Sequence, residues 1–112
     1  MPPTKEVFTL KVSIIIPTFN EALILEDSLR AIFDLNPYEI IVADGGSNDR
    51  TLSVARRMAT HVITSRTGRA EQMNAGAKKA TGNILLFMHA DNKLPKQSFK
   101  KMTEIMQLAS HA

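Results

Sequence analysis

The fold of this chain is decided by the stretch VSIIIPTFNE, residues 12–21, in which an apolar run meets a polar turn. The β-branched run from Val12 to Ile16 is typical of a strand that is buried on both faces, as parallel sheets require. We expect Pro17 to stop this strand and Asn20-Glu21 to open a helix. A strand followed closely by a helix is the first unit of an α/β fold.

The same order of strand and helix recurs three more times. Further strands are predicted from Glu39 to Ala43, from His61 to Thr64 and from Ile84 to Met88. Helices are predicted from Asn20 to just before Asn36-Pro37, from Thr51 to Ala59, from Arg69 to Ala80 and from Pro95 to Leu108. Short connections between alternating elements favour right-handed parallel crossovers. We therefore expect one α/β domain over residues 1–112, a three-layer α/β/α sandwich with a parallel sheet of about four strands.

Apolar residues at helical spacing indicate how the first and last helices pack. In the first helix the apolar positions are Leu25, Leu29, Ile32 and Phe33. In the last helix the side chains expected to face inward are Phe99, Met102, Ile105 and Met106.

Composition excludes several classes of protein. The 112 residues hold no cysteine, so a disulfide scaffold and a cysteine-ligated zinc are excluded. The longest apolar runs fall far below the roughly 20 residues of a membrane span, and the N-terminus has no apolar core of a signal peptide. We therefore expect a cytoplasmic protein without a membrane span, for which peripheral contact with the inner membrane face stays open.

The charge balance does not indicate a nucleic-acid partner. Fourteen Lys and Arg against 11 Asp and Glu give a net charge of +3, and the basic residues are interleaved with acids. Aromatic residues make up only 5% of the chain, so a basic groove with stacking aromatics is not expected. The small positive excess suits an anionic small molecule better than a polymer.

Candidate functional residues collect in the loops that follow the predicted strands. Ligands of parallel α/β sheets bind at the carboxyl ends of the strands, and the loops expected there are residues 17–21, 44–51, 65–69 and 89–92. Turn chemistry alone could explain their polarity. Their acid content goes further than turns need, with Glu21, Asp44, Asp49 and Asp91 all predicted at one edge of the sheet.

Asp44 has two interpretations. It closes a strand and precedes Gly45 and Gly46, so its carboxylate could hydrogen-bond a nucleobase or a ribose that the glycines allow to approach closely. The run Asp-Gly-Gly-Ser also fits a plain Asx-turn. Ser47 or Asn48 could then cap the next helix, with Asp49 in its first turn.

The starts of two other helices are also candidates for anion binding. Thr18, Asn20 and Glu21 lie at the start of the first helix, where Asn20 could be a simple N-cap or the exposed amides could hold an anion. Arg69 lies in the first turn of a later helix, which Asn74 continues. A cation at a helix N-terminus is disfavoured by the dipole, so Arg69 would gain from a phosphate partner; a solvated arginine is the alternative.

His89 and Asp91 directly follow the last predicted strand. In an extended segment, side chains at positions i and i+2 point to the same side. A carboxylate together with diphosphate oxygens and waters suits Mg²⁺ or Mn²⁺. The alternative is a turn aspartate beside a packed histidine. The chain has no G-x-G-x-x-G after the first strand, no P-loop and no G-x-S-x-G, so three common nucleotide-binding and hydrolase motifs are excluded.

Taken together, the four loops resemble the family-2 glycosyltransferases, which have the GT-A fold. The resemblance runs from about residue 11 to residue 108 and is carried by the segments 12–21, 41–51, 69–76 and 85–91. The sequence also resembles a bacterial subgroup associated with radical-SAM proteins, in the motifs Gly68-Arg69, Met73-Asn-Ala-Gly76 and His89-Ala-Asp91.

The resemblance implies a nucleotide-diphospho-sugar donor, with a UDP-sugar expected, and a divalent cation, Mn²⁺ or Mg²⁺, for inverting transfer. Asp91 matches the last acid of the family's DXD metal motif and His89 replaces the first, so these two are the expected metal ligands. By the same resemblance, the residues expected to bind the nucleotide-sugar are Pro17, Thr18, Asn20, Glu21, Asp44, Gly45, Asp49, Arg69, Asn74 and Asp91.

The resemblance also implies that this chain is the N-terminal, nucleotide-binding half of the fold. Family members are longer, and their further part carries the acceptor site and the general base, so no catalytic residue is expected here. In the family the strand from Ile84 to Met88 lies inside the sheet. Its exposed edge here would favour a homo-oligomer or pairing with another chain. Alternatives are a non-catalytic nucleotide-binding or interaction module, or a nucleotidyltransferase-like α/β enzyme.

Overall fold

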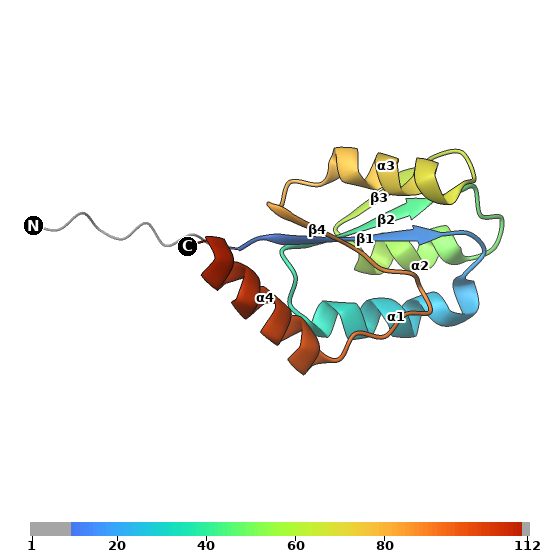
Figure 1. Ribbon diagram of the computed structural model, residues 1–112. Helices are drawn as coiled ribbons and strands as arrows, with labels where there is room; N and C mark the ends of the chain where they lie inside the picture. The colour runs from blue at the N-terminus through green and yellow to red at the C-terminus, as the bar shows by residue number, and fades with distance from the viewer. Residues whose placement is uncertain (1–9, 111–112) are drawn as a thin grey trace, which may run out of the picture.

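In the computed structural model, which describes residues 10–110, strands and helices alternate along the chain (Figure 1). The strands are β1 (Val12–Thr18), β2 (Glu39–Asp44), β3 (His61–Thr64) and β4 (Ile84–Phe87). The helices are α1 (Ala22–Asp34), α2 (Thr51–Met58), α3 (Arg69–Lys79) and α4 (Lys96–Ser110). The four strands form one parallel sheet in the order β3-β2-β1-β4, which confirms the predicted α/β class.

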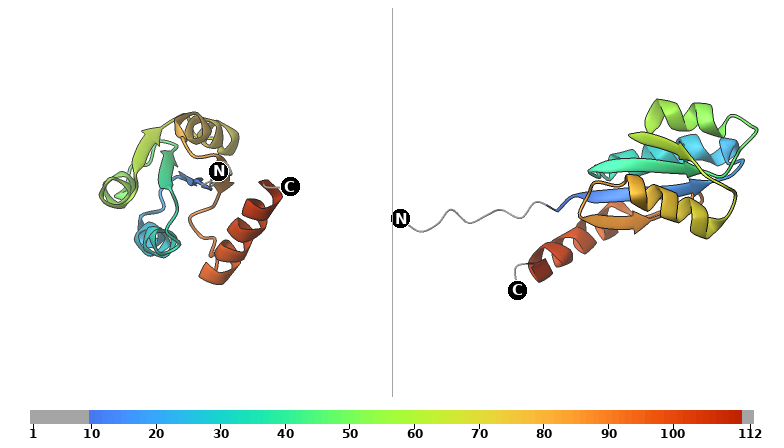
Figure 2. Two further views of the ribbon diagram at one scale, coloured as in Figure 1. Left: turned by 90° about the vertical axis from the view of Figure 1, so that its left-hand side faces the viewer. Right: turned by 90° about the horizontal axis from the view of Figure 1, so that it is seen from above.

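The helices cover the two faces of the sheet unequally. α3 packs alone against one face, over β1 and β2, while α1, α2 and α4 lie on the other face (Figure 2). The three layers are therefore helix, sheet and helix, as expected. This arrangement brings the carboxyl ends of all four strands to one edge of the sheet.

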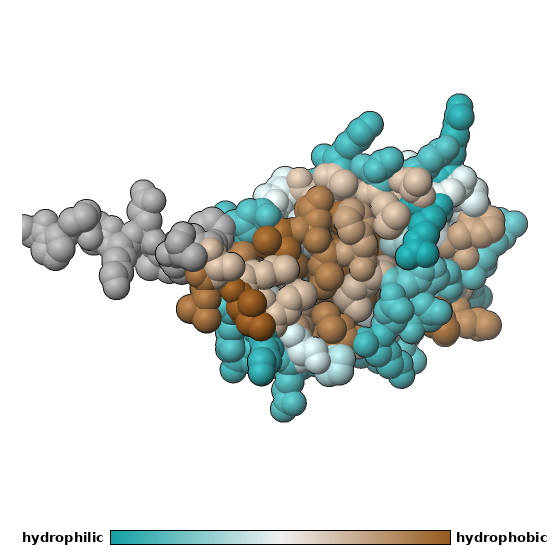
Figure 3. Space-filling view, in the orientation of Figure 1, coloured by the Kyte–Doolittle hydropathy of each residue, from teal (hydrophilic) through white to brown (hydrophobic). Residues whose placement is uncertain are grey.

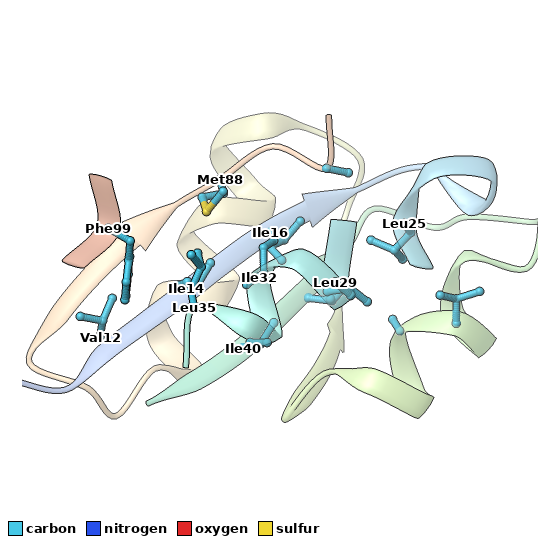
Figure 4. Close-up of a cluster of buried hydrophobic side chains, with 14 residues drawn as sticks. Val12, Ile14, Ile16, Leu25, Leu29, Ile32, Leu35, Ile40, Met88 and Phe99 are labelled. Atoms are coloured by element: carbon cyan, nitrogen blue, oxygen red, sulfur yellow. The ribbon is translucent and has the colours of Figure 1, made fainter. Parts of the chain in front are cut away.

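The central strands β1 and β2 are buried along their whole length. Their side chains alternate, so Ile14 and Ile16 point into the core on the α1 side (Figure 4). Val42 belongs to the same core, while Ile15 faces α3. The core on the α1 side is also closed by Leu25, Leu29 and Ile32 of α1, Val54 and Ala55 of α2, and Phe99 of α4. Burial on both faces explains why these strands read as continuous apolar runs in the sequence.

The prediction that Pro17 stops the first strand is wrong, because β1 continues to Thr18 and Pro17 pairs with Ala43 of β2. Successive residues of a strand direct their backbone polar groups to opposite neighbours. Thr18 O accepts from Gly45 N on the β2 side, and Ile15 O accepts from Met88 N on the β4 side. The nitrogen of Pro17 therefore faces the β4 side beyond the end of that strand, where no ladder hydrogen bond is lost.

Two side chains on the apolar faces of the helices lie elsewhere than their spacing suggests. Phe33 is 66% exposed and Ile105, which was expected to face inward, is 58% exposed. Each residue turns a helix by about 100°, so Phe33 is rotated away from buried Ile32, and Ile105 lies about 120° away from buried Phe99.

β4 is an edge strand with an apolar surface. Its register with β1 places Leu85 and Phe87 on the face that α3 covers, since Phe87 pairs with Ile15. α3 packs over β1, β2 and β3, and Leu85 and Phe87 remain 42% and 43% exposed. Figure 3 shows apolar residues gathered over β4 on this side of the molecule. The predicted strand from Ile84 to Met88 ends one residue earlier, at Phe87.

Candidate functional site

The four loops that follow the strands meet at one edge of the sheet, which we call the rim (Figure 1). They are residues 19–21, 45–50, 65–68 and 88–95. These are the segments in which the sequence places its candidate residues. Ligands of parallel α/β sheets bind at this edge, so the hydrogen bonds between these loops determine which groups are available to a ligand.

Asp44 lies at the centre of the rim and is fully buried. Its Oδ1 accepts from Thr18 Oγ1 at 2.8 Å and from Ser47 Oγ at 2.6 Å. Its Oδ2 accepts from the backbone N–H of Gly46 at 2.9 Å and of Ser47 at 2.7 Å. The Asx-turn interpretation of Asp44 is thus realised, and the side chain of β1 residue Thr18 is tied to it.

These four donors keep Asp44 ionised. Burial acts to raise the pKa of the carboxyl, but the hydrogen bonds from Ser47, Thr18 and Gly46 outweigh it, and the pKa is lowered below its ordinary 3.8. A negative charge is therefore fixed in the floor of the rim at neutral pH. Gly46 has a φ of 100°, the left-handed conformation that favours glycine, and this turns the loop over the carboxylate.

The loops after β1 and β2 are joined by Asn20. Its backbone N–H donates to Ser47 Oγ at 2.7 Å, and its Oδ1 accepts from Asn48 N at 3.0 Å. Asn20 has a φ of 51° and precedes the helix by two residues, so it bridges two loops and is not the N-cap of α1. Neither Ser47 nor Asn48 caps α2, since both are engaged in this bridge or with Asp44.

Asp49 and Thr51 link the starts of α1 and α2. Asp49 Oδ1 accepts from Thr51 N at 2.8 Å and from the Thr51 hydroxyl, and its Oδ2 accepts from Ala22 N at 3.3 Å. Thr51 Oγ1 in turn accepts from Glu21 N at 2.8 Å. The hydroxyl of Thr51 is the largest cause that lowers the pKa of Asp49. Asp49 therefore satisfies the orphan amides of two helix starts.

The loop after β3 is held by Gln72, a residue that the sequence did not single out. Gln72 is 5% exposed, and its Nε2 donates to Thr18 O at 2.8 Å and to Ala43 O at 3.0 Å. Its Oε1 accepts from Gly68 N at 3.1 Å. Glutamine carries no local signal for such a role, because these carbonyls lie 54 and 29 residues away in the chain.

The other candidates occupy different positions. Pro17 is buried in β1, and Gly45 is buried beneath the rim, where an added Cβ would lie 2.8 Å from Gln72 Oε1. Arg69 is exposed at the first residue of α3. Asn74 is exposed on the same helix, about 200° around from buried Gln72, so it points away from the sheet.

His89 and Asp91 lie side by side, with His89 Nδ1 at 2.8 Å from Asp91 Oδ1. The chain here is a turn rather than the expected extended segment: Asn92 N donates to His89 O at 3.0 Å, and His89 N donates to Asn92 Oδ1 at 2.9 Å. Both side chains are exposed, at 42% and 69%. Ser28 of α1 donates to Ala90 O, which holds this loop against α1.

A second polar cluster, also missed by the sequence analysis, lies at the opposite end of the strands. Buried Glu39 accepts from Ser13 Oγ at 2.5 Å and from Thr81 N at 2.6 Å, with His61 Nε2 at 3.7 Å. Gly82 N donates to Ser13 Oγ at 2.9 Å. The same end holds an apolar groove of about 850 Å³ between α4 and the start of β1. These features are remote from the rim.

The family comparison agrees with the fold. A family model described as glycosyl transferase family 2 matches residues 13–111. A PGL/p-HBAD biosynthesis glycosyltransferase of Mycobacterium bovis is 39% identical over 92 residues, covering 73% of this chain and 36% of that protein. A dolichol-phosphate mannosyltransferase of Pyrococcus furiosus is 35% identical over 111 residues, covering 90% and 31%. This chain spans about a third of the length of these relatives.

Solved structures show the same architecture. Glucosyl-3-phosphoglycerate synthase from Mycobacterium tuberculosis, in complex with Mn²⁺, UDP and glucosyl-3-phosphoglycerate, superposes with a TM-score of 0.66 at 26% identity, covering 73% of this chain and 34% of that one. Residues 1–349 of S. aureus TarS superpose with a TM-score of 0.69 at 27% identity, covering 87% and 32%. Among the described residues, no helix has the length and apolar character to span a membrane.

The parallel sheet, the polar loops at its rim and the family match over nearly the whole chain lead to one assignment. The fold is that of the GT-A glycosyltransferases, and the chain belongs to glycosyl transferase family 2.

Proposed function

We propose that residues 1–112 act as a nucleotide-sugar-binding domain for inverting glycosyl transfer, with a UDP-sugar as donor. The observation that carries this proposal is the rim itself. Three strand-end loops are hydrogen-bonded to one another around an ionised, buried carboxylate, Asp44, at the edge where parallel sheets bind ligands. Solved structures of mycobacterial glucosyl-3-phosphoglycerate synthase, which shares this fold, are complexes with UDP and Mn²⁺ or Mg²⁺.

The candidate residues divide between the parts of the donor. Thr18, Asp44 and Gly45 would form the floor under the base, where a base N–H would replace the Ser47 hydroxyl on Asp44 Oδ1. Arg69, exposed at the start of α3, would pair with the diphosphate. The residues that would shape the walls beside this floor are Asn20, Glu21 and Asp49, while buried Pro17 would support the floor from within β1.

Asp91 and His89 fit a divalent cation that is shared with a diphosphate. The described residues contain no group of three His, Cys, Asp or Glu side chains that could hold a metal on its own. Mg²⁺ and Mn²⁺ at phosphate sites commonly use one or two protein ligands and complete their shell with phosphate oxygens and water. The exposed Asp91 carboxylate, next to the His89 imidazole, offers that donor set. Such a cation stabilises a departing diphosphate.

The acceptor site and the general base are not assigned to any residue of this chain. Asn74, which the resemblance placed in the donor site, points away from the sheet, so we assign it no contact with the donor. Inverting transfer needs a carboxylate that deprotonates the acceptor hydroxyl. We propose that this group is supplied from outside residues 1–112, and we expect donor binding without turnover.

The test is calorimetric titration of UDP into the chain, first with Mn²⁺ and then with EDTA. We expect metal-dependent binding that Asp44→Ala abolishes and Asp44→Asn weakens, with circular dichroism showing that both variants are folded. Asp27→Ala, which removes an exposed carboxylate of α1, is the matched control and should bind as the wild type does. Unchanged affinity in Asp44→Ala would refute the assigned base pocket, and absence of UDP binding to wild type would favour a non-catalytic interaction module.

We also propose that two copies of the chain associate through β4. Within the described residues, β4 pairs only with β1, so its outer edge carries unpaired backbone groups. The strand Ile84–Phe87 contains no charge and no proline, the usual protection of an edge, and it exposes Leu85 and Phe87. A second β4 could pair with this edge and cover the apolar surface seen in Figure 3.

A further inference from the structure

Gln72 uses its whole side-chain amide to hold three segments of the rim. The two hydrogens of Nε2 go to Thr18 O, at the end of β1, and to Ala43 O, near the end of β2. Oε1 accepts from Gly68 N, one residue before α3 begins. The backbone N–H of Gln72 also donates to Gly68 O at 2.9 Å. Gln72 therefore binds both the N–H and the carbonyl of Gly68, at the start of α3.

The groups that Gln72 binds lie next to the two charged candidate residues of the rim, Asp44 and Arg69. Thr18 donates its hydroxyl to Asp44, and Ala43 directly precedes Asp44 in β2. Gly68 directly precedes Arg69. Gly45 packs so closely on Gln72 that an added Cβ would meet its Oε1 at 2.8 Å and its Cδ at 2.9 Å. Gln72 is therefore in contact with both the Asp44 side and the Arg69 side.

No other side chain of similar length satisfies all three partners. Glutamate has no N–H to donate, so its carboxylate would face two carbonyl oxygens; methionine fills the volume but leaves the three backbone groups without this partner. Because Gln72 is only 5% exposed, water cannot readily replace the hydrogen bonds that these substitutions remove. The need here is for two donors and one acceptor in one planar group, which only an amide of this length provides.

We propose that Gln72 is a positioning residue that fixes the start of α3, and with it Arg69, relative to Asp44. This inference rests on the donor site described above. The Asp44 side has hydrogen bonds of its own from Thr18, Gly46 and Ser47. The start of α3 is bonded to β1 and β2 by the two Gln72 donors, beside one bond from the Thr67 hydroxyl to Gly45 O. Loss of Gln72 therefore weakens recognition of the diphosphate more than recognition of the nucleoside.

The first experiment compares UDP with uridine by calorimetry in wild type, Gln72→Met and the control Gln97→Met. Gln97 is exposed on α4, a different helix from that of Gln72, and provides a matched substitution. We expect Gln72→Met to raise the Kd for UDP about tenfold and the Kd for uridine by less than about threefold. Gln97→Met should change neither value. Equal losses for UDP and uridine would overturn the positioning role.

The second experiment tests the hydrogen bonds independently of any ligand. In Gln72→Glu, burial and the two facing carbonyls would raise the pKa of the new carboxyl, and the protonated form could donate to one of them. Relative to wild type, this variant should lose stability in urea at about pH 7.5 and recover part of it at about pH 5. Gln97→Glu should show no such recovery.

The two experiments separate failure of this inference from failure of the donor site. If the wild type binds no UDP, the proposed function is wrong, and the pH comparison alone decides whether Gln72 acts through its hydrogen bonds. If UDP binds and the stability deficit of Gln72→Glu is the same at both pH values, Gln72 only fills space and the inference is wrong.

Discussion

At the scale of single residues, the rim depends on the ionisation of Asp44. A group whose pKa is lower in the folded state contributes stability that is present above its unfolded value, 3.8, and is lost as the pH falls through the lowered folded value. Asp44→Asn removes the charge and replaces one of the two acceptor oxygens by an NH2 group, so that two of the four hydrogen bonds from Thr18, Gly46 and Ser47 lose their acceptor. We expect it to reduce the free energy of unfolding by about 1.5–3 kcal/mol near neutral pH.

Urea denaturation between about pH 7 and about pH 3 measures this effect. The difference between wild type and Asp44→Asn should shrink toward the acid end, because protonation of Asp44 in the wild type removes the same charge. A difference that grows as the pH falls would contradict the assigned ionisation.

Gly76 allows α3 to pack closely on β1 because it has no side chain. A Cβ at this position would lie 2.4 Å from Ile15 Cγ2, because α3 packs directly on β1. Alanine would gain about 1 kcal/mol of helix propensity over glycine, but overpacking a core typically costs about 1–3 kcal/mol. With so short a contact the clash dominates, and Gly76→Ala should lower the thermal midpoint, while Lys78→Ala on the exposed side of α3 should leave it nearly unchanged.

At the scale of elements, Glu39 fastens the α3–β4 loop to the start of β1 and β2. Burial acts to raise the pKa of Glu39, but hydrogen bonds from Ser13 and Thr81 outweigh it, and the pKa is lowered from 4.5. Its stabilising contribution is therefore present above pH 4.5 and is lost as the pH falls through the lowered value. Gly82 could not carry a side chain here, since a Cβ would lie 2.4 Å from Ser13 Oγ.

Replacing Glu39 tests this junction. Glu39→Gln keeps the size of the side chain but turns an N–H toward Ser13 or Thr81, and it should lower the free energy of unfolding by about 1.5–3 kcal/mol near neutral pH. Hydrogen exchange should increase most at Thr81 and Gly82, the amides of that loop. Glu104→Gln, at an exposed position of α4, is the control; equal effects of the two substitutions would exclude a specific junction.

At the scale of the whole molecule, the outer edge of β4 is where we propose that two copies of the chain associate. Size-exclusion chromatography with light scattering should detect a dimer at high protein concentration. Phe87→Lys places a charge on the exposed edge and should shift the protein to a monomer. Phe33→Lys makes the same change at an exposed position of α1 and should leave the dimer intact. A wild type that stays monomeric at high concentration would refute association through β4.

The sequence by itself determined the order and type of the elements and the place of the candidate site. Strand and helix signals are local: the β-branched run in β1, the helical spacing of Leu25, Leu29 and Ile32, and the glycines after Asp44 act within a few residues. Because the carboxyl ends of parallel strands share one edge, the loops after them could be predicted to form one site.

Only the tertiary structure decided which of these residues meet and what each does there. The strand order β3-β2-β1-β4 brings Thr18 to Asp44 and Asn20 to Asn48, and it places Gln72 beneath two strand ends. It also left Phe33 and Ile105 in solvent. Such contacts join residues that lie far apart in the chain, and their free energies depend on burial and on donors from other elements, which no local pattern encodes.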